Sequence, residues 1–592
     1  MKVILIFFDT LRKDFLEPYG CNWVHTPNFQ RLAEKSVTFD NHYSGSLMCI
    51  PARRELHTGR YNFLHRSWGP LEPFDDSMPK LLKEKGIYTH LVSDHYHYWE
   101  VGGSTYHTQY NTWEIIRGHE GDPWKGEVKD PMIPDHVFNM REESAPHWRQ
   151  DWVNRKYMQK EENMPQTRTF EKGLEFIITN QEEDNWFLQI ETFDPHEPFY
   201  TQKKYKDLYK DNYDGPHFDW PNYSVVTEPP DQVEHCRKEY AASVSMCDYY
   251  LGTALDLMDE KDLWKDTMLI VTTDHGFLLG EKDWWGKSVT PVYNEIAQIP
   301  LFIWDPRIKK KNERRNALVQ TIDLAPTILE FFGVRCPKDM QGKILKETID
   351  SDTKIREVAL FGMHGAHVNI TDGQYLYMRG PINPINKPLY NYTLLPTHMR
   401  EFFSIHELQT IELSEPFAFT KGCKTLKTSA RHRYGTPYIY GSLLFDLKDD
   451  PKQENPIFDS NIEIMMIQLL RGEMKKNDAP LEQYERLGIP YDGEIKKKHL
   501  NLEDKRSEIE ETIGDIQIVW KNKGKSMYYY ILNYLPKPMH MQFNNQIKQA
   551  VNNKNIKEID EDLLIELMSK FIPKNYKRLI ETMFTLIKRK AK

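Results

Sequence analysis

The stretch Val3-Ile4-Leu5-Ile6-Phe7-Phe8-Asp9-Thr10, close to the amino terminus, decides the fold. An unbroken apolar run of this length, ended at once by an aspartate, is typical of a strand that is buried on both faces. Such strands occur in parallel sheets whose two faces are covered by helices. A carboxylate directly after the strand also lies at the sheet edge where α/β proteins bind ligands.

Short apolar runs alternate with helical patterns over the first two-thirds of the chain. Further strands are expected at Thr89–Ser93, Trp186–Thr192, Met268–Thr273 and Pro300–Trp304, and helices at Thr26–Ser36, Ser77–Lys85, Phe170–Asn180, Lys238–Lys261 and Thr321–Phe332. Strands and helices that alternate in this way predict an α/β fold with a large mixed sheet sandwiched by helices.

The pattern changes near Ala366, after which short strand-like runs are separated by turns. We therefore expect a large α/β domain over 1–365, a smaller C-terminal subdomain with an antiparallel sheet over 366–494, and a helical extension over 495–592. Within the extension, 555–571 and 575–590 have the apolar spacing of amphipathic helices. Such stripes must be buried, either on the same chain or against a second copy, so a homo-oligomer formed through the tail is one of two expectations.

Composition excludes several classes of protein. Hydrophobic residues make up 39% of the 592 residues and the formal net charge is −9, which excludes a mainly disordered chain and a generic basic nucleic-acid binder. No apolar run approaches the roughly 20 residues of a transmembrane helix, and the run that starts at Val3 lacks the features of a secretory signal. We expect a cytoplasmic protein with no nucleic-acid or membrane partner.

Carboxylates and imidazoles follow four of the expected strands. Because the carboxyl ends of parallel strands meet at one edge of a sheet, these side chains are expected to lie close together and to favour a metal site. They are Asp9, Asp94, His95, Asp194, His196, Asp274 and His275.

Asp9, Asp274 and His275 combine hard oxygen ligands with one imidazole. This composition favours calcium, manganese or magnesium over a thiolate-bound zinc. Thr10 either adds a hydroxyl ligand or serves as the N-cap of a helix, and both interpretations stay open on the sequence.

A further motif is Cys49-Ile50-Pro51-Ala52-Arg53, followed by Arg54-Glu55-Leu56-His57-Thr58-Gly59-Arg60. Pro51 suits the first helical turn, where its missing N–H costs nothing. Cys49 then lies at the positive end of the helix dipole, which favours an anionic substrate. Arg53 can turn its guanidinium towards the same anion.

This Cys-x-Pro-x-Arg pattern, with Thr-Gly-Arg after it, resembles the signature of the type I sulfatases of the alkaline phosphatase superfamily. The resemblance covers about residues 1–460. Other segments that resemble the same family are Tyr19-Gly20, Thr26-Pro27-Asn28, Asp194-Pro195-His196-Glu197-Pro198-Phe199, Thr273-Asp274-His275-Gly276, Gly286-Lys287-Ser288, Ile299-Pro300-Leu301 and Leu444–Pro451.

The resemblance implies that a separate maturase oxidises Cys49 to formylglycine. One hydroxyl of the hydrated aldehyde attacks sulfur and expels the alcohol, and the second then expels sulfate. It also implies that Asp9, Asp274, His275 and the modified Cys49 bind a divalent metal, for which we expect calcium first and manganese or magnesium next.

Further roles follow from the same resemblance. Arg53 would hold the formylglycine hydrate, while Lys287 and His196 would contact sulfate and the leaving oxygen, with His196 suited to donate a proton. The chain departs from the family in two places. Thr10 stands where many members have a second aspartate, and the lysine that many carry after the strand ending at Ser93 is missing. His95 or His97 is expected to replace that lysine as a sulfate contact.

The sequence therefore predicts a sulfuric ester hydrolase that cleaves a small sulfate ester, either a sugar sulfate or an aryl or alkyl sulfate. Two alternatives remain at this point. One is a phosphonate monoester or phosphodiester hydrolase that uses the same formylglycine and metal. The other is a non-catalytic assembly protein built on the same fold.

Overall fold

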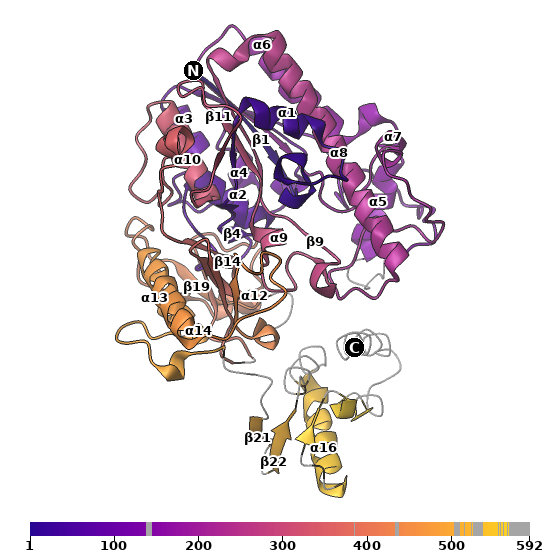
Figure 1. The fold of residues 1–592 in the computed structure, drawn as a ribbon, viewed down its shortest axis with the longest axis vertical. Coiled ribbons are helices and arrows are strands. Elements are labelled where there is room, and N and C mark those ends of the chain that lie inside the picture. Colours follow the sequence, from indigo (N-terminus) through magenta and orange to yellow (C-terminus); the bar gives the residue numbers. More distant parts are fainter. Residues whose placement is uncertain are drawn as a thin grey trace.

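The computed structural model describes residues 1–137, 145–383, 385–432 and 437–502 and, in the tail, 509–513, 516–521, 524, 528, 537–554, 556, 558–560, 562–564, 566 and 567. An eight-stranded mixed sheet forms its centre, in the order β12-β2-β11-β8-β1-β7-β5-β6 (Figure 1). The expected large mixed sheet is thus confirmed. Its strands are β1 Lys2–Phe8, β2 Val37–Phe39, β5 Tyr88–Ser93, β6 Thr112–Ile115, β7 Trp186–Thr192, β8 Thr267–Thr273, β11 Leu301–Trp304 and β12 Glu313–Arg315.

The alternation of side chains along β1 explains why helices cover both faces. All of β1 is buried, with Ile4, Ile6 and Phe8 in one hydrophobic core and Val3, Leu5 and Phe7 in the other. Two apolar faces each need a covering layer. The first core is completed by α1 Pro27–Lys35, α6 Pro165–Asn180 and α8 Pro230–Glu260, and the second by α2 Cys49–Thr58, α3 Met78–Glu84 and α10 Leu324–Phe331.

The register of the central strands brings their carboxyl ends to one level. Phe8 pairs with Thr192 of β7 and with Thr273 of β8, and all three strands are parallel. The residues that follow directly, Asp9, Phe193 and Asp274, therefore start from the same edge of the sheet.

A smaller five-stranded sheet has the order β20-β16-β15-β14-β4. It is covered by α13 Ser460–Lys476, shown in orange in Figure 1, and its antiparallel strands are β14 Ala359–Met363, β15 Val368–Thr371, β16 Tyr375–Arg379 and β20 Leu443–Asp446. The first of these antiparallel strands, β14, begins at Ala359. The expected domain boundary after residue 365 therefore falls between β14 and β15. Its last strand, β4 Ser46–Leu47, was not expected and pairs parallel with β14. Because β4 stands just before Cys49, the smaller sheet is joined directly to the Cys49 segment.

The tail differs from the helical extension that we expect. Its described residues include α16 Lys537–Lys554 but also a small sheet of β21 Ile509–Ile513, β22 Ile516–Trp520 and β23 Glu558–Ile559. The isoleucines and valine of this hairpin favour strands. The expected helix over 575–590 lies outside the described residues and that over 555–571 is described only in part. A homo-oligomer formed through the tail stays a prediction. Among the described helices, none is both long enough and apolar enough to span a bilayer.

The start of α1 is held by a side chain from α8. The buried carboxylate of Asp248 accepts hydrogen bonds from the backbone N–H of Phe29, at 2.8 Å, and from the side-chain amide of Asn28, at 3.0 Å. The first N–H groups of a helix have no partner inside it, so this acceptor serves as a cap supplied by another helix.

We expect Asp248→Ala to lower the free energy of unfolding by about 2 kcal/mol, because it leaves buried donors without a partner. Asp256→Ala is the matched control on α8, since it removes an ion pair to Arg31 of α1 but its side chain is 71% exposed, and it should cost less than about 1 kcal/mol. Denaturant unfolding measures both variants. Equal losses would show that Asp248 is not an effective cap.

Candidate active site and metal centre

Four side chains predicted as metal ligands meet at the edge of the large sheet. Asp9 follows β1, Asp274 and His275 follow β8, and Cys49 is the first residue of α2. Each offers one ligand atom, these atoms all lie within 4.8 Å of one another, and all four residues are buried. The Cys49 Sγ lies 3.2 Å from Nε2 of His275. A cluster of two carboxylates, an imidazole and a sulfur atom is suited to a divalent cation.

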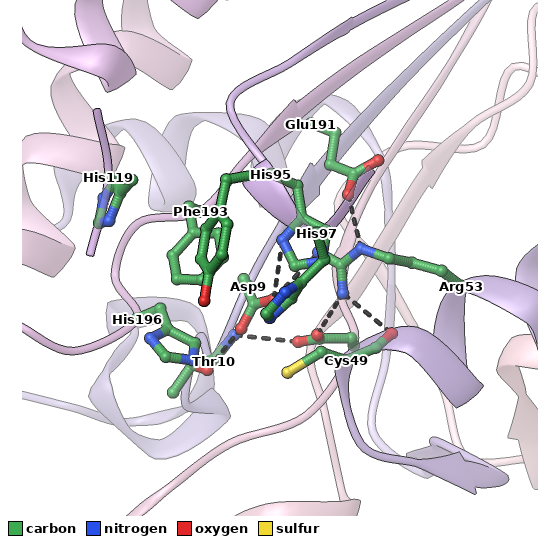
Figure 2. Close-up of polar contacts among 12 residues, drawn as sticks. Asp9, Thr10, Cys49, Arg53, His95, His97, His119, Glu191, Phe193 and His196 are labelled. Carbon is green, nitrogen blue, oxygen red and sulfur yellow. Dashed lines mark hydrogen bonds and ion pairs between the residues drawn. The ribbon is translucent and has the colours of Figure 1, made fainter. Parts of the chain in front are cut away.

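Arg53, one helical turn after Cys49, directs its guanidinium towards Asp9 and enters from the right in Figure 2. Its guanidinium donates to Asp9 Oδ2 at 3.0 Å, to Asp274 Oδ2 at 2.8 Å and to Glu191 Oε1 at 2.6 Å. It also donates to the backbone carbonyl of Cys49 at 3.0 Å. Burial opposes the charge, but Glu191, Asp9 and Asp274 raise the pKa of Arg53 well above its ordinary value, so it stays protonated. Arg53 thus lies beside Cys49, as expected, and also holds both carboxylates of the metal cluster.

Glu191 is a site residue that the sequence reasoning missed. It lies within β7, and its carboxylate also accepts hydrogen bonds from the hydroxyl of Tyr98, at 2.9 Å, and from the amide of Gln189, at 2.9 Å. These two donors fix the carboxylate, which in turn fixes Arg53. A signal was present, because Gln189 and Glu191 interrupt an otherwise buried apolar strand.

Thr10 lies inside the site in a left-handed backbone conformation, with φ of 64°. Its hydroxyl donates to Asp9 Oδ1 at 2.6 Å and accepts from Lys287 Nζ at 2.9 Å, and its N–H donates to Asp274 Oδ1 at 3.0 Å. The interpretation of Thr10 as an N-cap is wrong, because the next helical turn has Arg12 at that position. Thr10 instead links Lys287 to the two carboxylates, and its role as a metal ligand stays a prediction.

Lys287 and His196 lie on the opposite side of Asp9 from Arg53. Lys287 Nζ is 3.9 Å from Asp9 Oδ1 and 3.7 Å from Glu197 Oε2. Burial opposes its charge, but Cys49, Glu197 and Asp9 raise the pKa of Lys287, so the ammonium is kept. Burial and the charge of Lys287 lower the pKa of His196 well below its ordinary range. His196 is therefore neutral in the free protein, which differs from the near-neutral titration expected for it.

His95 is buried and stacks on Phe193, with ring centroids 4.9 Å apart. Its Nδ1 lies 3.9 Å from Asp9 Oδ2, and neither ring nitrogen has a hydrogen-bond partner in the structure. Buried polar groups are normally paired, so an orphan imidazole beside the metal cluster is available to a ligand. This geometry is consistent with the predicted contact between His95 and sulfate.

Two of the strand-end acids do not join the cluster. Asp94 accepts from the backbone N–H of Phe193 at 2.6 Å, and Asp194 forms an ion pair of 3.1 Å with His119. Despite burial, the Asp194 carboxylate raises the pKa of His119 to about 9. Both acids therefore hold the loop around Phe193. The ends of β5 and β7 still supply groups to the site, but these are the imidazoles of His95 and His196 and not the acids Asp94 and Asp194.

Comparisons with known proteins agree with this geometry. The family model described as Sulfatase matches residues 2–334. An arylsulfatase of Clostridium perfringens is 23% identical over 61% of this chain and 81% of its own length. An N-acetylglucosamine-6-O-sulfatase of Bacteroides thetaiotaomicron is 24% identical over 60% of this chain and 71% of its own length. The solved structure of a phosphonate monoester hydrolase from Silicibacter pomeroyi, 18% identical, superimposes with a TM-score of 0.54 over 80% of this chain and 94% of the other.

The fold and the site define an enzyme with a mixed α/β fold that belongs to the alkaline phosphatase superfamily. Within it, the chain belongs to the sulfatase family and is a sulfatase, because the family model spans more than half of its length. The reading as a non-catalytic assembly protein is set aside on this ground.

We predict that Glu191→Gln lowers kcat/KM by about tenfold or more, because residues that orient groups around a metal site carry effects of this size. The substitution keeps the volume of the side chain but removes the charge that holds Arg53. Tyr98→Phe removes only one hydrogen bond to Glu191 and should cause a smaller loss. Steady-state kinetics and melting temperature are measured together. A Glu191→Gln protein with full activity would contradict this positioning role.

Proposed function

We propose that the protein hydrolyses a small sulfate ester with a formylglycine made from Cys49 and a divalent metal bound beside it. The observation that carries this proposal is the convergence of Cys49 with Asp9, Asp274 and His275 at the amino end of α2. Lys287 keeps its positive charge next to this cluster, which makes the site suitable for an anionic group.

The donor set fits the implied metal. Arg53 bridges the buried carboxylates of Asp9 and Asp274 but also pairs with Glu191. One positive charge thus faces three negative charges, so a further cation beside Asp9 and Asp274 is favoured. Burial and Lys287 lower the pKa of His275 to about 3, so its imidazole is neutral and can act as a ligand above that pH. Asp9, Asp274, His275 and the modified Cys49 would hold the metal, with calcium proposed first and manganese or magnesium next. When bound, the metal would neutralise part of the sulfate charge.

Arg53, Lys287 and His196 have separate roles around the substrate. Arg53 holds the backbone carbonyl of Cys49 and so sets the orientation of the reacting residue. Lys287 keeps its charge and is placed to stabilise the sulfate oxygens. His196 is neutral before substrate binds, with Nδ1 directed to the backbone carbonyl of Glu197, so we propose that the anionic substrate raises its pKa before it protonates the leaving oxygen.

The substrate proposed is a sugar sulfate or an aryl or alkyl sulfate, and the proposed protein partner is a maturase that oxidises Cys49. Two relatives, an arylsulfatase and an N-acetylglucosamine-6-O-sulfatase, support these two substrate classes. The cytoplasmic location expected from the sequence stays a prediction.

A phosphonate monoester hydrolase is the second candidate. Thr10 favours this candidate, because the resemblance to the type I sulfatases implies an aspartate at this position in many members. The likeness to a solved phosphonate monoester hydrolase favours it as well. An uncharged residue at this point lowers the negative charge of the metal site by one unit.

A direct comparison of substrates separates the two candidates. The protein, produced together with a maturase, is given nitrophenyl sulfate and nitrophenyl phenylphosphonate under the same conditions. We expect kcat/KM to be at least about tenfold higher for the sulfate, which corresponds to about 1.4 kcal/mol of transition-state stabilisation. A preference of the same size for the phosphonate would replace the proposed function with the second candidate.

Removal of the metal should lower activity and stability together. We predict that exhaustive chelation abolishes turnover and lowers the melting temperature. The buried ligand groups then lose an ion that binds only the folded state, and Arg53 alone does not balance the charge of the carboxylates. Calcium or manganese added back should restore both properties. Elemental analysis before and after chelation is the control. An enzyme that holds no metal and keeps its activity would contradict the metal proposal.

A further inference from the structure

A second cavity lies at the other end of α2. Its walls come from the end of α2 and the segment after it, and from the three-stranded sheet of β17 Tyr390–Thr393, β18 Glu412–Leu413 and β19 Leu426–Ser429 with the connection between β18 and β19. The walls include Arg60, His65, Tyr392, Phe417 and Phe419. At a rise of 1.5 Å per residue, the ten residues of α2 separate this cavity from Cys49 by about 15 Å.

Arg60 is the anomalous group in this cavity. Gly59, with φ of 59°, ends α2, and Arg60 follows it with only 4% of its surface exposed. Its Nε and Nη2 atoms are buried and have no hydrogen-bond partner. Its guanidinium carbon lies 3.3 Å from the centroid of the Phe419 ring, an attraction that offsets only part of the cost of burying a cation.

The neighbouring carboxylate that could pair with Arg60 is already occupied. Asp75 accepts two hydrogen bonds from Arg54, at 2.7 and 3.1 Å. Burial lowers the pKa of Arg60 to about 9, because the charges of Asp75, Asp339 and Asp478 offset the cost of burial only in part. At neutral pH the guanidinium still carries its charge, so the cavity contains an uncompensated positive charge beside unused donors.

The size of the cavity limits what can neutralise this charge. The centre of a water-sized species can occupy about 10 Å³ of it, which suffices for one small species and excludes a sugar or a nucleotide. The walls opposite Arg60 are aromatic, with Phe417 and Phe419 stacked at 5.5 Å. These rings supply no charge and no strong hydrogen-bond donor, so a strongly hydrated dianion would lose its water here without compensation.

We propose that this cavity binds one small monovalent inorganic anion, of the size of chloride or bromide, through Nε and Nη2 of Arg60. The anion lies between α2 and the aromatic side chains of the β17-β19-β18 sheet. It therefore stabilises the contact between that sheet and the helix that carries Cys49. This binding site is separate from the sulfate pocket and is independent of the proposed reaction.

The test uses the full-length, metal-loaded protein and halides as the probe. Melting temperatures are measured in sodium chloride, sodium bromide and sodium gluconate at one ionic strength. We expect chloride and bromide to raise the melting temperature by roughly 2 °C or more over gluconate, in a saturable manner. Arg60→Gln should abolish this difference, whereas Arg314→Gln, which removes an exposed arginine paired with Asp40, should keep it.

Anomalous diffraction from a bromide-soaked crystal of the wild-type protein locates the anion, and it decides the matter even where Arg60→Gln does not fold. We expect a bromide peak within hydrogen-bond distance of Nε and Nη2 of Arg60. A cavity without a bromide peak, or a halide effect that is unchanged in Arg60→Gln, would overturn the proposal and leave water as the occupant.

Discussion

The site depends on one interaction, the contact of the buried Arg53 guanidinium with the carboxylates of Asp9, Glu191 and Asp274. All four side chains are inaccessible to solvent, where an unpaired charge would cost several kcal/mol. Each carboxylate comes from a different strand of the large sheet, and the arginine comes from α2. The ion-pair network therefore fixes the helix that carries Cys49 against the carboxyl ends of β1, β7 and β8. A charge network of this kind is retained for geometry more than for stability, since apolar residues would pack there at lower cost.

Cys49 is also held between the large sheet and the smaller sheet. Cys49 is bounded on one side by β4, which belongs to the smaller sheet, and on the other by the rest of α2, which packs on the large one. Glu55 of α2 accepts hydrogen bonds from the backbone of Gly45, at 2.9 Å, and of Ser46, which closes the loop before Cys49. A reactive residue held from both sides is positioned without a flexible loop, which is the arrangement that preorganised catalysis requires.

Much of this could be predicted from the sequence. The apolar run ending at Asp9 located the central strand, and the Asp274-His275 pair located its neighbour, because both patterns are local. Glu191 could not be assigned a role, since one polar residue in a strand does not reveal which helix it will meet. The pairing of β4 with β14 depends on residues more than 300 positions apart, for which no local pattern exists. The neutral state of His196 was also missed, because it arises from burial and from Lys287, which come from the folded arrangement and not from the residue type.

The central claim is that Cys49 becomes the reactive aldehyde of a sulfatase. Its direct test is the mass of the proteolytic peptide that contains Cys49, measured on active protein from its native source. The account predicts the mass of formylglycine in place of the cysteine thiol, together with reaction of that peptide with an aldehyde-specific hydrazide. An unmodified thiol at Cys49 in a preparation that turns over sulfate esters at full rate would contradict the account.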